Sequence, residues 1–414
     1  MKKFFILFIL IFLPLSVFAQ EEIPLELQKE DAFVPSEPVI EYHNPDFDVE
    51  IEKNSLPDIS KPQEIITENT SFFERLKKNA KDVYKLQIEN TDVPSCLFKD
   101  ALTFEIDKGP IEELHLWTVV QTTYSTDIEE SGDTTNLFRV SLINTLIDGK
   151  FRGGKESFRI MLDPTPQNNR PFFQNFFQDV YIDTKRIPHH RILIGNSRPK
   201  VGHEGASSSY TLPFINRAQI SRHFGTARKT GVRVIGNYSL VDYDFGGYLA
   251  DTYFSELFSG GEFDGWVDLK PLGKTDGKYG DLTLGGGIVA GSRHSTNFFV
   301  TSTYLGYKYK KLWMKAEYAN ANGSNGVTGL TDKHRHGWYV TLGYMLTKKL
   351  EAVLRYDDFN PDENISNNNI REYSAGINYY IKGLALLVML NYVFCQNQAG
   401  PDSHRIMVGT QIVF

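Results

Sequence analysis

One segment of the chain is unusually rich in cations. Between Thr184 and Val241 there are ten Lys or Arg residues and a single acid, Glu204. Guanidinium groups bind phosphate oxygens bidentately, and rings of Arg or Lys lower the barrier for anions in a pore. We therefore expect an anion-binding segment, whose candidate contact residues are Arg198, Lys200, Arg217, Arg222, Arg228, Lys229 and Arg233. An external patch that touches anionic lipopolysaccharide is the alternative.

Further basic residues alternate with apolar ones. Arg139 lies between Phe138 and Val140, and Arg159 between Phe158 and Ile160. Neighbouring side chains of a strand point to opposite faces. If the apolar face meets lipid, the basic face points inward, because a midplane cation on the lipid side costs about 2–4 kcal/mol. The expected inward set is Arg139, Arg159, Lys315, Arg355 and Arg405, together with Arg233. Pairing with lumen acids such as Glu351 or Glu372 is the alternative role.

The elements that carry these residues read as membrane strands. In the last ten residues, Ile406, Val408, Thr410, Ile412 and Phe414 share one face. This pattern is typical of the C-terminal strand of an outer-membrane barrel, and Phe414 is the expected signal for the assembly machinery. Similar alternation recurs in 312–318, 338–344, 350–356 and 372–380.

The connections between these segments differ in length. Lys310–Lys311, 347–349 and Lys382–Gly383 read as tight turns, whereas 320–334, 358–370 and 396–403 read as longer polar loops. Short periplasmic turns that alternate with longer external loops favour a barrel over a soluble sandwich.

Counting back from the end gives about sixteen strands. The earlier ones are expected near 112–123, 134–147, 157–163, 175–185, 190–198, 230–241, 248–257, 261–269, 280–290 and 297–309. The sequence thus predicts an all-β transmembrane antiparallel barrel with an aqueous lumen. The irregular stretch 199–230 would be its third external loop.

The N-terminal part has a different character. Residues 1–19 read as a Sec signal peptide cut before Gln20, and no later stretch reaches 18 apolar residues. Residues 20–95 hold 18 acidic and 8 basic residues, which gives a net charge of −10. Residues 96–414 hold 33 acidic and 34 basic residues, which gives a net charge of +1. We expect 20–95 to be a mostly disordered acidic periplasmic linker. It contains a short amphipathic helix near 71–87, which packs on the rim or between protomers, or serves as a plug or cell-wall contact.

Several residue groups resemble the phosphate-selective porin O and P family. They are Ile192–Asn196, Gly202–Gly205, Ser207–Ser209, Phe214–Arg217, Arg228–Val232, Arg355–Asp357 and the terminal Phe414. The likeness extends over most of 110–414. Asn216 stands where the family usually has Glu, and Lys229 where it usually has Asp, so both departures remove a negative charge.

The resemblance implies a homotrimer of sixteen-stranded barrels. It also implies that the third loop folds into the pore and forms a constriction lined by basic groups.

Other chemistry finds little support in the sequence. The pairs His334/His336 and His189/His190 have no further ligands at metal-site spacing, and Gly285–Gly287 is not followed by a phosphate-loop Lys. We expect no cofactor, no enzymatic activity and no nucleic-acid partner. Cys96 and Cys395 could pair if the barrel brings its first and last strand regions together.

These patterns together predict an outer-membrane porin. We expect a water-filled, anion-preferring channel for phosphate or related small anions, in contact with outer-membrane lipid and lipopolysaccharide. A general weakly selective porin, or a structural barrel tethered or plugged by its extension, are the alternatives.

Overall fold

A computed structural model describes residues 102–165, 176–225, 227–252, 260–275, 277–293, 296–324 and 330–413. The expected signal peptide, the linker 20–95 with its helix near 71–87, Cys96 and Phe414 lie outside these residues. Cys395, within them, is a free thiol.

The described residues form seventeen strands and three short helices. The strands are β1 (Leu102–Glu105), β2 (Ile111–Glu129), β3 (Thr134–Phe151), β4 (Glu156–Leu162), β5 (Phe177–Thr184), β6 (His190–Ser197), β7 (Lys229–Asn237), β8 (Val241–Thr252), β9 (Gly260–Leu269), β10 (Asp281–Arg293), β11 (Thr296–Tyr309), β12 (Leu312–Ser324), β13 (Leu330–Met345), β14 (Leu350–Asn360), β15 (Ile370–Tyr380), β16 (Leu386–Asn397) and β17 (Ser403–Val413). The helices are α4 (His203–Ala206), the 3-10 helix η2 (Ser209–Thr211) and α5 (Gln219–Phe224).

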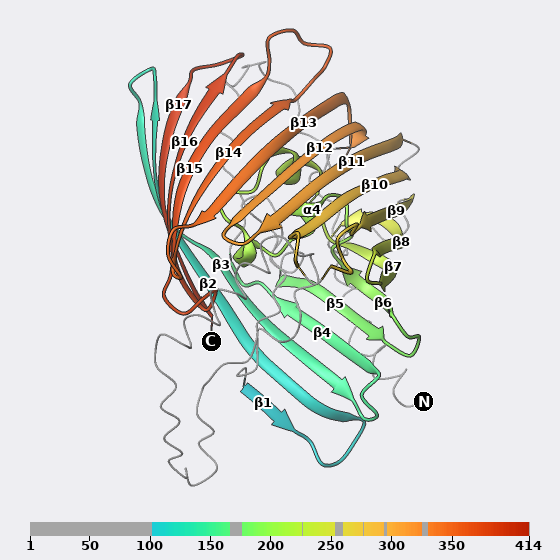
Figure 1. Cartoon of the computed structure of the whole chain (residues 1–414). Helices are drawn as coiled ribbons and strands as arrows, with labels where there is room; N and C mark the ends of the chain where they lie inside the picture. Colours follow the sequence, from blue (N-terminus) through green and yellow to red (C-terminus); the bar gives the residue numbers. More distant parts are fainter. Residues whose placement is uncertain are drawn as a thin grey trace, which may run out of the picture. The chain divides into compact units, whose positions relative to one another are not determined.

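Strands β2 to β17 close into a barrel of antiparallel neighbours (Figure 1). The closure joins β17 to β2, with Val413 opposite Val119 and Ser403 opposite Glu129. The short β1 pairs with the first part of β2. The predicted all-β barrel of about sixteen strands is therefore confirmed. Each of these sixteen strands therefore has a hydrogen-bonded neighbour on both sides.

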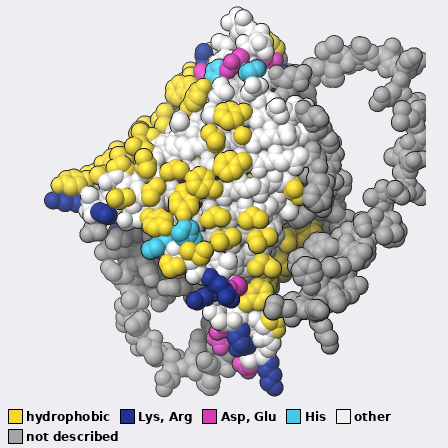
Figure 2. Space-filling view, turned by 90° about the vertical axis from the view of Figure 1, so that its right-hand side faces the viewer, with side chains coloured by type: hydrophobic (Ala, Val, Ile, Leu, Met, Phe, Trp, Pro, Cys, Tyr) yellow, Lys and Arg dark blue, Asp and Glu magenta, His cyan; other side chains and the backbone are white. Residues whose placement is uncertain are grey.

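The alternation seen in the sequence separates an outer face from an inner one. On β17, Ile406 and Val408 are 45% and 40% exposed, whereas Met407 between them is 2% exposed. The same two-residue period holds on β11, β13 and β14. Figure 2 shows apolar side chains spread over the outside of the strands. Polar and charged side chains are enclosed instead.

The connections define two ends of the barrel. At the end called here the turn end, adjacent strands are joined by 106–110, 152–155, 185–189, 238–240, 270–280, 310–311, 346–349 and 381–385. The opposite loop end carries the longer 163–176, 198–228 and 361–369. Among the described residues, no helix is long and apolar enough to cross a membrane.

Two connections differ from the expectations, and one turn of the expected length is longer than its neighbours. The loop expected at 320–334 is shorter, because β12 runs to Ser324 and β13 begins at Leu330. At the turn end, 270–280 is longer than its neighbours and holds its own hydrogen bonds, such as Gly273 N–H to Lys270 O at 2.9 Å. The strand expected from Tyr248 begins at Val241, because a turn at 238–240 closes with Tyr238 N–H donating to Val241 O at 3.0 Å.

The third loop, 198–228, lies inside the ring of strands, where Figure 1 shows α4. Its apolar side chains contribute to two buried clusters. Tyr210 and Phe214 join Trp117, Leu146 and Trp313 of the wall in one cluster. Ile220 and Phe224 join wall residues such as Tyr339 and Phe359 in the other. Burial of these groups stabilises the loop within the lumen, since each large apolar side chain contributes roughly 1.5–3 kcal/mol.

Candidate constriction site

The third loop is compact because two glycines meet within it. A Cβ on Gly205 would lie 2.7 Å from Cα of Gly225, and a Cβ on Gly225 would lie 2.8 Å from Cα of Gly205. Any larger residue at either position would push α4 and α5 apart. The sequence shows these glycines, but not that they face each other.

Two carboxylates of the wall bind backbone N–H groups of the loop. Glu317 on β12 accepts from the N–H of His203 at 2.8 Å and of Glu204 at 3.2 Å. Asp357 on β14 accepts from the N–H of Gln219 at 2.7 Å. The first N–H groups of a helix have no partner within it, so these acids satisfy groups that burial would otherwise leave unbonded.

Wall amides fix the stretch between the helices. Asn391 accepts from the N–H of Ile215 at 2.8 Å, and Asn378 donates to the carbonyl of Pro213 at 2.9 Å. Both residues are fully buried. The loop is thus hydrogen-bonded to β12, β14, β15 and β16.

Five of the seven predicted anion-contact residues form ion pairs with the wall. Lys200 lies 2.6 Å from Asp268, and Arg228 2.6 Å from Asp179. Arg222 bonds both oxygens of Glu372 at 3.0 Å. The remaining two pairs are Lys229 with Glu262 and Arg233 with Asp244.

The other two, Arg198 and Arg217, bind carbonyls of the loop itself. They donate to the carbonyl of Ser207 at 3.1 and 2.6 Å, and Arg217 also bonds that of Glu204. Both side chains are buried. The structure therefore brings all seven residues into or beside the loop, where they contact protein acids and carbonyls.

The five basic residues predicted to point inward lie on the enclosed face of their strands. Arg159 pairs with Asp148 at 2.7 Å, Arg355 with Glu204 at 3.1 Å, and Arg405 with Asp127. Lys315 is buried, with its ammonium 5.5 Å from the centre of the Trp313 ring. The fifth, Arg139, has a different setting.

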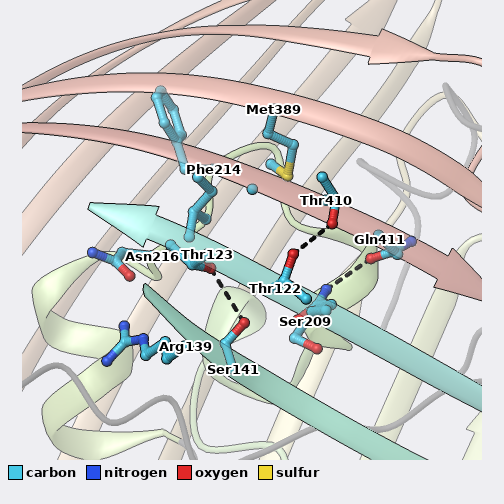
Figure 3. Close-up of a pocket in the computed structure, with 13 residues that line it drawn as sticks. Thr122, Thr123, Arg139, Ser141, Ser209, Phe214, Asn216, Met389, Thr410 and Gln411 are labelled. Atoms are coloured by element: carbon cyan, nitrogen blue, oxygen red, sulfur yellow. Dashed lines mark hydrogen bonds between the residues drawn. The ribbon is translucent and has the colours of Figure 1, made fainter. Parts of the chain in front are cut away.

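Arg139 lines an opening between the third loop and the wall formed by β2, β3 and β17 (Figure 3). The loop contributes Ser209, Phe214, Ile215 and Asn216 to this opening. The wall contributes Arg139 and a group of uncharged residues, namely Gln121, Thr122, Thr123, Ser141, Met389, Gly409, Thr410 and Gln411.

Hydrogen bonds between wall side chains shape the polar side of the opening. Thr123 Oγ1 and Ser141 Oγ lie 3.2 Å apart, and Gln121 donates to Gln411 at 2.7 Å. Arg139 is the one charged residue among the described residues that line the opening. Asn216 lies on its loop side. A mobile anion there would meet one cation, and the other described lining residues are uncharged.

Two histidines of the loop are stacked on aromatic rings of the wall. The rings of His203 and Tyr304 lie 3.7 Å apart, and those of His223 and Phe359 lie 4.3 Å apart. Burial lowers the pKa of His203 well below its usual 6.5, and Lys200 and Lys315 lower it further against the opposing effect of Asp268. Burial, with Arg222 and Arg335 nearby, lowers the pKa of His223 to about 3. Both are neutral at pH 7.

Sequence reasoning missed the acids that hold the loop. Glu317, Asp357 and Asp268 are buried at inward positions of β12, β14 and β9. Their signal was the presence of charged residues at alternate positions of strands whose other face is largely apolar. Within the described chain, no group of three His, Cys, Asp or Glu side chains could hold a metal ion.

Comparisons with known proteins agree with this geometry. Residues 278–412 match the family model described as phosphate-selective porin O and P. Among solved structures, an anion-selective porin from Comamonas acidovorans is similar with a TM-score of 0.55 and 14% identity, over 73% of this chain and 99% of that one. The outer membrane channel DcaP of Acinetobacter baumannii gives 0.54 and 13%, over 75% and 99%. No curated protein sequence matches the chain.

Proposed function

We propose that this protein is an outer-membrane channel for passive diffusion of small anions, because residues 278–412 match the model of the phosphate-selective porin O and P family and the chain has the porin fold. The opening beside Arg139 is its constriction. The observation that carries the proposal is the lining itself, which holds one cation and no acid among the described residues. A cation at a narrow point lowers the barrier for anions and raises it for cations.

The basic residues divide into two roles in this proposal. Arg198, Lys200, Arg217, Arg222 and Arg228 hold the third loop in place and so set the width of the opening. Lys229 and Arg233, which lie on β7 directly after the loop, pair with acids of β9 and β8. Arg139 contacts the passing ion, with the hydroxyls of Thr123 and Ser141 beside it. Conduction requires binding that is favourable but weak, and the described lining supplies one guanidinium among otherwise uncharged residues.

Neutralising Arg139 tests the proposal. In planar bilayers with a salt gradient, we expect the reversal potential of Arg139→Gln to shift toward the value of a cation-selective channel. The reason is that the described lining residues of the opening then carry no charge. Arg139→Lys is the matched control and keeps the anion preference. An unchanged reversal potential in Arg139→Gln, or a cation-selective wild type, would contradict the anion assignment.

Phosphate is the anion that we propose first. Its support is the description of the family and the bidentate fit of a guanidinium to phosphate oxygens. The expected result is a decrease of the chloride current when millimolar phosphate is added. A chloride current that phosphate leaves unchanged would contradict the proposed phosphate preference, but not the proposed anion channel.

A general, weakly selective porin is the second candidate. It is favoured by the ion pairs, since five of the seven cations of the loop region meet wall acids instead of an open lumen. Such a pore would give a wild-type reversal potential near zero. The Arg139 experiment therefore separates the two candidates.

We further propose a homotrimer, inserted by the barrel assembly machinery through β17 and the terminal residue Phe414. The family resemblance supports the trimer, and the apolar outer face of β17 supports lipid contact. Native mass spectrometry of the full chain should give three copies. Deletion of Phe414 should lower the amount of assembled protein in the outer membrane.

A further inference from the structure

Four neighbouring connections at the turn end are rich in lysine. They are 270–280, 310–311, 346–349 and 381–385, which join β9 through β16 in pairs. In sequence they contain one acid, Asp276, and eight lysines, namely Lys270, Lys274, Lys278, Lys310, Lys311, Lys348, Lys349 and Lys382. We call these eight residues the lysine arc. Lys270 is partly neutralised, because its ammonium lies 2.6 Å from Asp242.

Three lysines of the arc lie over tyrosine rings. The ammonium of Lys310 is 4.9 Å from the ring centre of Tyr309, that of Lys278 is 5.2 Å from Tyr279, and that of Lys349 is 5.9 Å from Tyr379. The tyrosines are 38%, 56% and 43% exposed. Each pair thus joins a cation to a large aromatic surface that the described residues leave uncovered.

These pairs belong to the outside of the barrel. Tyr309 and Tyr379 lie near the ends of β11 and β15, whose outward residues are apolar. Leu312 and Tyr344, which pair with each other across β12 and β13, are also exposed nearby. The ammonium groups therefore lie where the apolar outer face ends, and not at the opening beside Arg139.

The opposite part of the same rim has a different arrangement. There Arg186 pairs with Glu156 and Lys150 with Glu113. Arg152 donates to the carbonyls of Ile106 and Gly109 at 2.8 and 3.1 Å. These three cations contact protein acids and carbonyls. The arc is distinguished by its three lysines that lie over exposed tyrosine rings.

We propose that the lysine arc binds anionic phospholipid headgroups in the leaflet at the turn end. This rests on the proposed outer-membrane location, in which the short-turn end faces the periplasm. Tyrosine rings sit at the headgroup level of a membrane, and lysines beside them meet the phosphates. The acidic residues 20–95 would be attracted by the same charge, but outward tyrosines at the end of an apolar face suit a lipid.

Lipid retention by the full chain tests this inference. The protein is purified in detergent, mixed with equal amounts of phosphatidylglycerol and phosphatidylcholine, and the retained lipids are counted by native mass spectrometry. We expect a clear preference for phosphatidylglycerol. The variant Lys278→Gln/Lys310→Asn/Lys349→Gln should retain at least about fivefold less of it, since one lysine near an anionic surface contributes roughly 1 kcal/mol. Asn is chosen at position 310 because Lys310 has a φ of 53°, in the left-handed region that Asn adopts more readily than Gln.

Two further variants make the result specific. Replacing the same three lysines by Arg should keep the retention, and Lys155→Gln/Lys185→Gln, on the opposite part of the rim, should leave it unchanged. Equal retention of both lipids by the wild type would overturn the inference. A preference for phosphatidylglycerol that the triple variant keeps would also overturn the inference. The same holds for a preference that appears only after residues 20–95 are removed. A barrel that conducts anions but fails this test would keep the proposed function.

Discussion

The third loop meets two kinds of wall. Toward β12, β14 and β15, its backbone and its cations meet buried carboxylates, among them Glu317, Asp357 and Glu372. Toward β2, β3 and β17 it meets hydroxyls, amides and one guanidinium, that of Arg139. Similar basic residues therefore have different surroundings on the two sides. On the first side the arginines serve as anchors, and on the second side Arg139 lines an opening whose other described lining residues are uncharged.

The comparison also separates stability from selectivity. A buried ion pair is neutral as a whole, so it adds little to the field that a passing ion meets. Breaking such a pair is costly, because the remaining charge stays buried without its partner. We expect changes on the anchored side to act on folding, and changes at the opening to act on ion preference.

Removing an anchor acid should have the largest effect. Arg228 is fully buried, and its Nε donates to Asp179 at 2.6 Å. Asp179→Ala leaves this guanidinium without its carboxylate, which should lower the free energy of unfolding by about 3–5 kcal/mol. The measurement is chemical unfolding of the barrel in detergent or lipid, followed by tryptophan fluorescence.

Glu156→Ala provides the matched control. It removes the partner of Arg186, whose side chain is 70% exposed at the turn end. Water solvates an exposed cation, so the loss should be much smaller than for Asp179→Ala. Equal losses in both variants would mean that burial does not distinguish the anchors from surface pairs.

The fold was more predictable from the sequence than the site. Alternation at two-residue spacing marks outward residues such as Ile406 and Val408 directly, because lipid and lumen demand opposite polarity on one strand. The third loop could also be located, since its cations cluster along the chain. Which acid each cation meets depends on contacts between residues far apart, such as Arg222 with Glu372. The opening joins Arg139 to Asn216 and Gln411, which no local pattern links.

Acidification should weaken the anchored side by a smaller amount. His203 is neutral and buried between Tyr304 and a group of charges that includes Lys200, Lys315, Asp268 and Glu317. Its pKa is lowered in the fold, so the unfolded loop takes up a proton first as pH falls below 6.5. Stability is complete above this pH and is lost below it, by about 1.4 kcal/mol per pH unit for one histidine.

Hydrogen exchange measures this loss at the loop itself. Between pH 7 and pH 5, the amides of the loop should lose protection by roughly 2 kcal/mol after correction for intrinsic rates. His203→Phe keeps a ring against Tyr304 and removes the titrating group, so its loop should show a weaker pH dependence. His223 still titrates in this variant. The same pH dependence in both proteins would exclude His203 as a cause.

The smallest expected effect comes from giving the opening an acid of its own. Asn216 and Arg139 line the same opening, and Asn216→Glu would add a carboxylate to it. The new negative charge would offset the positive charge of Arg139. The wall at the opening would then pair a cation with an acid, as the wall of β12, β14 and β15 does. At partly solvated separations the interaction is about 1 kcal/mol, so the permeability ratio of anion to cation should fall by about fivefold. Reversal potentials in a salt gradient measure it, and Asn216→Gln is the neutral control. If Asn216→Glu left the ratio unchanged, ions would have to cross the barrel by a route away from Arg139.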